Sequence, residues 1–129
     1  MNQVYVRYIV DDAETATRFY CDVLGFTEIM NPSPGFSLVE HGSLRLLLNA
    51  SGGAGAGRAL RDGSRPVPGG WNRIQLRVDD LDAEIDRIRQ LGVAFRSQVV
   101  ESMGGRHILL PDPSGNLIEL FESSDGRRG

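Results

Sequence analysis

Near the start of the chain, the pattern of apolar residues changes from one typical of a strand to one typical of a helix. Residues 4–10 are rich in β-branched and aromatic side chains, which favours a β-strand. Asp11 and Asp12 then supply helix-capping side chains, and the next apolar residues recur at helical spacing. Gly25 ends this pattern, because glycine readily adopts the left-handed conformation that terminates helices. The apolar positions of the predicted helix are Ala16, Phe19, Tyr20, Val23 and Leu24.

The same pattern returns in the second half of the chain. Residues 74–78 predict a strand, Asp79 and Asp80 follow as capping candidates, and Gly92 closes a second helix. Three short runs typical of strands follow each helix. They lie near 26–30, 36–40 and 44–49 in the first half and near 94–100, 106–110 and 117–121 in the second. The chain therefore predicts an α+β fold built from two βαβββ modules.

Module one spans about residues 3–50 and module two about residues 71–122, within a single domain over residues 1–129. Residues 51–70 between them are rich in glycine and contain Pro66 and Pro68, which predicts a mobile connection that could also act as a lid.

Composition narrows the class of partner. The net charge is -3 with a sequence pI of about 5.3, and the basic residues are spread along the chain, so we expect no nucleic-acid partner. No apolar run approaches the roughly 20 residues that span a bilayer, and no signal segment is evident, so we expect no membrane partner and a cytoplasmic location. Cys21 is the single cysteine, which fits a reducing compartment. All 14 basic residues are arginines, which excludes lysine Schiff-base chemistry.

Three segments carry a resemblance to a known family: Arg18-Phe19-Tyr20, Leu24-Gly25-Phe26 and the run from Asp112 to Leu120, Asp-Pro-Ser-Gly-Asn-Leu-Ile-Glu-Leu. With the duplicated Asp-Asp helix starts, the chain resembles the vicinal oxygen chelate superfamily. That superfamily includes glyoxalase (lactoylglutathione lyase), bleomycin-resistance proteins and extradiol dioxygenases. The resemblance implies curved mixed sheets, helices on the convex side and ligands in a concave cup that two modules complete within one chain or across a homodimer. We expect a homodimer on this basis.

Alternation along the strands sorts the side chains between the two faces of each sheet. It predicts that Leu117 and Phe121 share the cup face with Glu119. In the first strands of the modules, the residues expected on the cup face are Tyr5, Arg7 and Ile9, and Arg73, Gln75 and Arg77. We also expect Leu46 and Leu48 to make the cup partly apolar.

In the glyoxalase pattern, the resemblance assigns the metal-ligand positions to Tyr5, Leu46, Arg73 and Glu119. Of these, only Glu119 is an ordinary metal ligand, and a permanently charged guanidinium repels a cation. We therefore expect neither a metal nor another cofactor. Since the first and last strands of a module are neighbours, Arg73 and Glu119 should form an ion pair. That pair is either structural or part of a site where Arg73 grips an anionic ligand.

His107 is a candidate general acid or base together with Glu119, although its face of the strand stays open at this stage. Trp71 is expected to stack on a flat ligand or to fill a dimer seam. The full predicted ligand-binding set is Tyr5, Arg7, Leu46, Leu48, Trp71, Arg73, Gln75 and Phe121.

These observations favour a metal-independent, glyoxalase- or bleomycin-resistance-like protein that binds a small, partly apolar, anionic organic molecule. Two alternatives remain open from the sequence. One is a metal-dependent lyase, like lactoylglutathione lyase, or a dioxygenase with an atypical site. The other is a non-catalytic interaction module.

Overall fold

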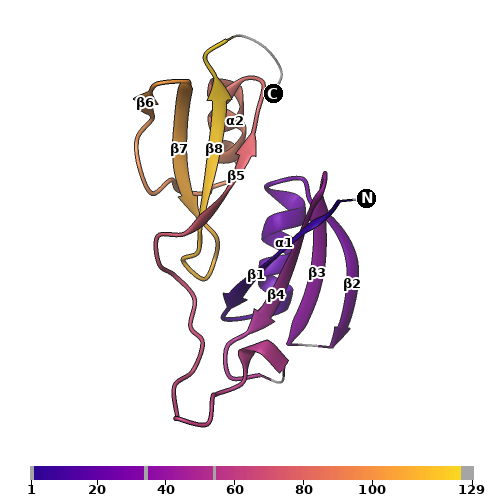
Figure 1. Ribbon diagram of the computed structural model, residues 1–129. Coiled ribbons are helices and arrows are strands. Elements are labelled where there is room, and N and C mark those ends of the chain that lie inside the picture. Colours follow the sequence, from indigo (N-terminus) through magenta and orange to yellow (C-terminus); the bar gives the residue numbers. More distant parts are fainter. Residues whose placement is uncertain (1, 34, 54, 126–129) are drawn as a thin grey trace. The chain divides into compact units, whose positions relative to one another are not determined.

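The computed structural model describes residues 2–33, 35–53 and 55–125, and the chain divides into two compact units (Figure 1). Unit 1 takes the residues up to Gly69 together with Asp112–Asn116. Unit 2 takes Gly70–Pro111 and the residues from Leu117 onward. The units thus correspond to the two modules, except that the turn at Asp112–Asn116 is counted with unit 1.

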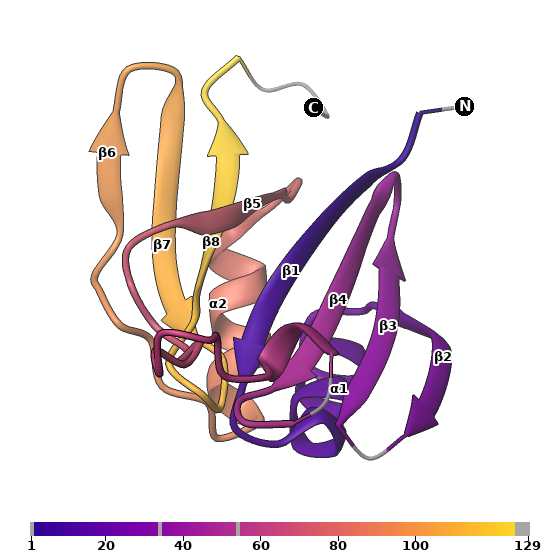
Figure 2. The ribbon, with the colours of Figure 1, turned by 60° about the horizontal axis from the view of Figure 1, so that its bottom comes forward.

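Each unit is a four-stranded mixed sheet with one helix (Figure 2). Unit 1 contains β1 (Val4–Val10), α1 (Ala13–Asp22), β2 (Thr27–Ser33), β3 (Phe36–His41), β4 (Leu44–Ala50) and the short 3-10 helix η1 (Gly55–Gly57). Unit 2 contains β5 (Arg73–Arg77), α2 (Leu81–Gln90), β6 (Val100–Ser102), β7 (Gly105–Pro111) and β8 (Leu117–Ser123). The strand orders are β1-β4-β3-β2 and β5-β8-β7-β6, so the predicted α+β class and the duplicated module are confirmed. In each sheet the first and last strands of the module are parallel neighbours.

Both helices begin and end where the sequence predicts. Asp12 accepts a hydrogen bond from the Thr15 backbone N–H at 2.9 Å, and Asp80 accepts one from Ala83 at 3.1 Å. Glycine follows each helix with a positive φ, 77° at Gly25. The caps therefore fix the helix boundaries locally.

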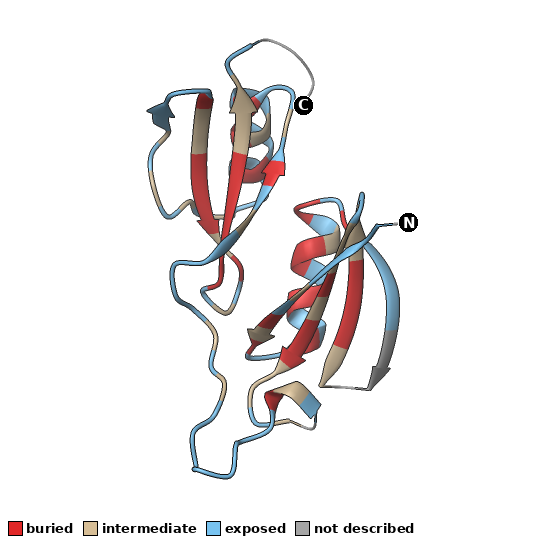
Figure 3. Cartoon of the chain, in the orientation of Figure 1, coloured by how far each residue is buried: buried red, intermediate tan, exposed pale blue. Residues whose placement is uncertain are grey.

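Each helix covers one face of its sheet and buries apolar side chains there, which Figure 3 shows as the buried parts of helices and strands. In unit 1, Tyr20 is fully buried and its ring meets Phe19 and Phe26 edge-on, with centroids 5.3 Å apart in both pairs. The core of unit 2 comprises Leu76, Leu81, Ile85, Ile88, Ile108, Leu110, Ile118 and Leu120. We call the face without a helix the open face of each sheet.

The strand predicted near residues 94–100 is wrong for most of its length, because β6 covers only Val100–Ser102. Arg96 donates its backbone N–H to the carbonyl of Leu109, but the Leu109 N–H is taken by the Ser97 hydroxyl at 3.1 Å. A side chain thus supplies the acceptor that a paired strand would supply, and regular pairing begins only at Val100.

Hydrogen bonds anchor parts of the connection over residues 51–70, whose mobility stays a prediction. The Ser51 hydroxyl donates to the carbonyl of Pro66 at 2.6 Å, and the Gly52 N–H donates to the carbonyl of Gly57 at 2.7 Å. A Cβ at Gly57 would collide with the carbonyl oxygen of Ala50. This close approach requires glycine and ties the connection to the end of β4.

Asp112 is the centre of a buried hydrogen-bond cluster within unit 1. Its Oδ2 accepts from the Tyr20 hydroxyl at 2.8 Å and from the Asn116 side-chain amide at 3.1 Å. Its Oδ1 accepts from the backbone N–H groups of Ser114 at 2.8 Å and Asn116 at 2.9 Å. The Asn116 amide also donates to the carbonyl of Ile9 at 2.8 Å. Burial raises the pKa of Tyr20 well above its usual value, with the nearby Asp112 acting in the same direction. The motif that carries the family resemblance is therefore a structural clamp around one carboxylate.

Membrane-spanning helices are absent from the part of the chain that the structure describes, since neither helix has the length and apolar character required.

Candidate functional site

The open face of unit 2 brings together most of the residues predicted in that module. In the parallel pair of β5 and β8, Gln75 lies opposite Glu119 and Arg77 opposite Phe121. In the antiparallel pair of β7 and β8, His107 lies opposite Phe121. Partners in register share a face, so His107 lies on the same face as Glu119, which answers the question that the sequence left open. We call this surface the unit 2 open face: Arg73, Gln75, Arg77, His107, Leu109, Glu119 and Phe121.

A chain of hydrogen bonds crosses this face from one arginine to another. The Nε of Arg73 donates to Glu119 Oε1 at 3.0 Å, which confirms the predicted ion pair. The Gln75 amide donates to Glu119 Oε2 at 2.7 Å, and the Nε of Arg77 donates to the amide oxygen of Gln75, also at 2.7 Å. Both oxygens of the Glu119 carboxylate are thus engaged, and each side chain orients the next.

The Glu119 carboxyl is held in its ionised form. Burial raises its pKa, but the hydrogen bonds from Gln75 and Arg73 outweigh burial, and the nearby charges of His107 and Arg73 act in the same direction. The net result is a pKa below the usual value for glutamate.

This shift predicts a pH-dependent contribution of Glu119 to stability. A carboxyl whose pKa is lowered by folding stabilises the protein above its unfolded pKa, about 4.3, and loses that contribution as the pH falls through the folded value. The stability difference between the unmodified protein and Glu119→Gln, measured by urea unfolding, should therefore shrink as the pH is lowered from 7 toward 3. Glu84→Gln, on the surface of α2, is the matched control. A difference that stays constant over this pH range would contradict the assignment.

Phe121 lies between a glycine and a guanidinium. The Cζ of Arg77 lies over its ring, 4.5 Å from the centroid. On β7, a Cβ added at Gly105 would lie 2.8 Å from the ring atom Cζ of Phe121 and would collide with the carbonyl oxygen of Glu122. Glycine at position 105 therefore makes room for the ring. Sequence reasoning placed Arg77 on this face but did not single it out, and it gave Gly105 no role.

Trp71 is 65% exposed just before β5. The guanidinium of Arg96 lies over the Trp71 ring, 5.3 Å from its centroid. The backbone carbonyl of Trp71 accepts a hydrogen bond from Arg73 at 3.5 Å. Trp71 is thus linked to the polar chain through its backbone carbonyl, and the residue stays largely exposed.

The open face of unit 1 carries a second set of predicted residues. Arg7 donates to the Asn49 side chain at 2.9 Å. Arg45 forms an ion pair with Glu40 at 3.3 Å and lies over the Tyr5 ring, with Cζ 5.9 Å from its centroid. Sequence reasoning missed Arg45 and Asn49 as members of this face, because it assigned the wrong parity to β4.

The prediction that Leu46 and Leu48 line the open face is wrong. Both are fully buried, and they lie opposite Val6 and Tyr8 of β1, on the face that α1 covers. Leu47, opposite Arg7, lies on the open face between Arg45 and Asn49. A shift of one residue along a strand moves a side chain to the other face of the sheet, so the assigned parity inverted both leucines.

Among the described residues, those of the unit 2 open face do not fit a divalent metal ion. Arg73, at a position that the resemblance assigns to a ligand, has no lone pair to donate, and its charge opposes that of a cation. Glu119 is the one carboxylate of this face, and its oxygens already accept from Arg73 and Gln75. Over residues 2–33, 35–53 and 55–125, no group of three or more His, Cys, Asp or Glu side chains gathers as a metal site would require.

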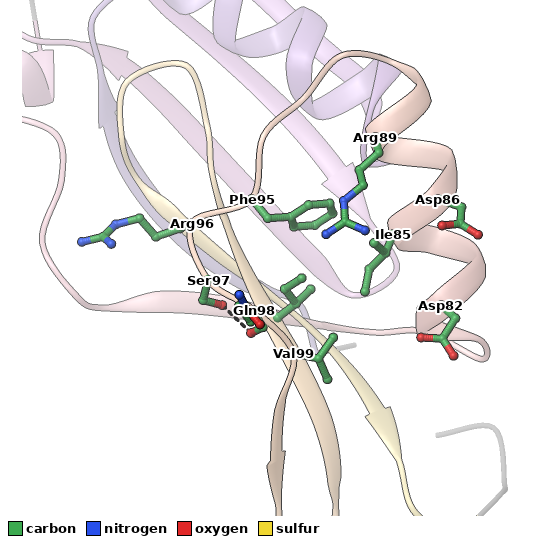
Figure 4. Close-up of a pocket in the computed structure, with 10 residues that line it drawn as sticks. Asp82, Ile85, Asp86, Arg89, Phe95, Arg96, Ser97, Gln98 and Val99 are labelled. Carbon is green, nitrogen blue, oxygen red and sulfur yellow. Dashed lines mark hydrogen bonds between the residues drawn. The ribbon is translucent and has the colours of Figure 1, made fainter.

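A groove of about 890 Å³ lies on the helix side of unit 2, away from its open face (Figure 4). Asp82 and Asp86 project from α2 along one wall beside Arg89, whose guanidinium lies 5.6 Å from the centroid of the Phe95 ring. The mixed charge of this wall gives no preference for an anion. Arg96 points away from the groove in this view.

Comparison with known proteins gives one family. The model described as Glyoxalase/Bleomycin resistance protein/Dioxygenase superfamily matches residues 2–120. The protein named virulence protein STM3117 of Salmonella typhimurium is 29% identical over 117 residues, which cover 88% of this chain and 78% of that protein. A bleomycin resistance protein of Geobacillus stearothermophilus is 25% identical over 120 residues, covering 88% of this chain and 90% of its own.

Among solved structures, TnmS3, an antibiotic binding protein from Streptomyces sp. CB03234, has a TM-score of 0.72 and 26% sequence identity to this chain. The match covers 96% of this chain and 97% of that one.

Proposed function

The chain belongs to the glyoxalase/bleomycin resistance protein/dioxygenase superfamily, and on that premise we propose that it binds a small, partly apolar, anionic organic molecule without a metal ion. The proposed site is the unit 2 open face. We further propose that the protein acts as a homodimer, as the resemblance suggests, and in a reducing compartment such as the cytoplasm, which its single cysteine fits.

The observation that carries this proposal is the engagement of Glu119. This carboxylate could bind a metal cation, but it instead accepts hydrogen bonds from Arg73 at 3.0 Å and from Gln75 at 2.7 Å. Two guanidinium groups, Arg73 and Arg77, thus share a face with a single carboxylate, although the whole chain carries a net charge of -3. Local positive charge on an acidic protein favours an anionic ligand.

The same face supports an apolar contact. Phe121 and the buried Leu109 lie beside the polar chain, and Trp71, whose backbone carbonyl accepts from Arg73, is an exposed aromatic residue. Ligand sites commonly combine such apolar surface with a few oriented polar groups. The names of two similar proteins, a bleomycin resistance protein and an antibiotic binding protein, agree with binding of this kind.

Catalysis is a second candidate function, favoured by the presence of His107 and Glu119 on one face. Glu119 is a poor choice for a general base, because its lowered pKa makes the carboxylate a weak acceptor of protons near neutral pH. His107 is then the acid–base group of this face. We rank binding first, and we rank a metal-dependent lyase or dioxygenase below both, because the described residues of the unit 2 open face supply one carboxylate, which is already paired with Arg73.

Elemental analysis tests the metal-independent part of the proposal. Protein purified without chelators and dialysed should hold zinc, nickel, manganese and iron at well below one ion per chain. One tightly held divalent ion per chain would contradict the proposal and favour the lyase or dioxygenase alternative.

A thermal-shift screen of aromatic carboxylates, sulfonates, phosphates, thiol conjugates and antibiotics tests the binding part. A ligand that binds only the folded protein at 100 times its Kd stabilises it by about 2.7 kcal/mol, which raises the Tm. We expect anions to raise the Tm more than neutral amides or esters of the same compounds. Equal shifts for charged and neutral forms, or no shift across the screen, would contradict an anion-binding site.

A further inference from the structure

The geometry points to Arg77, and not Arg73, as the residue that recognises the ligand's anionic group, and to a planar carboxylate as that group. This inference rests on the proposed function, because it concerns the same open face. It follows from how the two guanidinium groups are already engaged.

Arg73 already uses hydrogen-bond donors of its guanidinium within the protein. Its Nε donates to the Glu119 carboxylate, and one terminal nitrogen donates to the carbonyl of Trp71. The negative charge of Glu119 lies 3.0 Å from the guanidinium and compensates it. An incoming anion at Arg73 would therefore be repelled by the carboxylate that Arg73 already binds.

Arg77 is oriented but not neutralised. Its Nε donates to the neutral amide oxygen of Gln75 at 2.7 Å, and one face of its guanidinium lies over the Phe121 ring. Within the described residues, its two terminal nitrogens form no hydrogen bond and Arg77 has no carboxylate partner. The free edge of the guanidinium therefore presents two parallel N–H donors, which match the two oxygens of a carboxylate.

Two neighbouring side chains, Phe121 and Gln75, orient Arg77. Phe121 is backed by the glycine at position 105, and Gln75 is fixed by its own hydrogen bond to Glu119. A guanidinium that is already oriented loses less conformational freedom on binding, which favours affinity. Glu119, Gln75 and Arg73 thus act as positioning residues for Arg77.

Unit 1 carries no arginine at the position that corresponds to Arg77. Aligning Val10-Asp11-Asp12 with Val78-Asp79-Asp80 places Ile9 at the corresponding position of β1. In that unit, the arginine over an aromatic ring is Arg45, and it is paired with Glu40. The inference therefore predicts one carboxylate site per chain.

The experiment uses 1-naphthoate as the probe and 1-naphthamide as its neutral match, with the full chain labelled with 15N. The Nε–Hε signal of Arg77 is followed during each titration, and the Kd is measured for the unmodified protein, Arg77→Lys, Arg73→Lys and the control Arg87→Lys. Arg87 lies on α2, outside the proposed site. Lysine retains the positive charge but removes the planar pair of donors. Comparing each arginine with its lysine variant therefore separates recognition by two parallel N–H groups from attraction by charge alone.

We expect 1-naphthoate to shift the Arg77 signal and 1-naphthamide to leave it unchanged. Arg77→Lys should weaken naphthoate binding by about 10-fold or more, as loss of a charge-assisted bidentate contact does. Arg87→Lys should change the Kd by less than about 3-fold, which corresponds to well under 1.4 kcal/mol, and Arg73→Lys should weaken binding less than Arg77→Lys does. The signal of the unmodified protein gives an answer even if a variant fails to fold.

Two results would overturn the inference and leave the proposed function standing. One is naphthoate binding that Arg77→Lys leaves unchanged or that Arg73→Lys weakens more. The other is a thermal-shift screen in which sulfonates or phosphates bind while no carboxylate does. If no anion of any class binds, the proposed function fails as well.

Discussion

Replacement of Asp112 by alanine should destabilise the protein by about 3–5 kcal/mol, because several buried donors would lose their acceptor at once. The carboxylate accepts from the Tyr20 hydroxyl, from two backbone N–H groups and from the Asn116 side chain. Tyr20 is fully buried and Asn116 is 5% exposed, so water cannot easily replace the lost acceptor. Urea unfolding followed by circular dichroism would measure the change in the free energy of unfolding.

Three further variants make this prediction specific. Tyr20→Phe removes a single donor and should cost about 1 kcal/mol. Asp112→Asn keeps one acceptor oxygen and should fall between Tyr20→Phe and Asp112→Ala. Asp62 accepts from the backbone and hydroxyl of Ser64 in an exposed turn, so Asp62→Ala is the matched control and should cost less than about 0.5 kcal/mol. If Asp112→Ala lowered the free energy of unfolding no more than Asp62→Ala does, the hydrogen bonds to Asp112 would not contribute to stability.

Gly105→Ala should cost about 1–3 kcal/mol, as overpacking of a closely packed site does. The added Cβ would collide with the Glu122 carbonyl on the neighbouring strand and would lie 2.8 Å from the Phe121 ring. Either β7 moves away from β8 or the ring turns, and a turned ring no longer supports Arg77. The free energy of unfolding should fall, and naphthoate affinity should fall with it.

Gly35→Ala is the control for the glycine substitution. A Cβ there would meet only the Ala50 side chain at an ordinary 4.0 Å, so stability should change by less than about 0.5 kcal/mol. A Gly105→Ala protein as stable as the Gly35→Ala protein would show that the sheet accommodates the extra carbon. Normal stability with lost naphthoate binding would instead assign Gly105 to ring placement alone.

Local chemistry explains what the sequence determined by itself. The periods of apolar residues, the capping aspartates and the terminating glycines act over a few residues, so the duplicated strand–helix modules and the helix ends could be predicted. The ion pair between Arg73 and Glu119 also followed, because strand alternation and the parallel pairing of first and last strands place them together.

Pairing between distant segments decided the rest. The register of β4 on β1 turned Leu46 and Leu48 into the core, and the register of β7 on β8 brought His107 to the face of Glu119. The strand predicted over 94–100 shortened because the Ser97 hydroxyl occupies a backbone donor of β7.

The partners of Asp112 and the contact between Gly105 and Phe121 likewise join residues far apart in the chain or on neighbouring strands. Register, close approach and hydrogen-bond choice depend on which backbones meet in space, and a shift of one residue reverses the face of every side chain in a strand. A single sequence determines the elements and their apolar sides, whereas the assembled sheet determines which polar groups of those elements meet.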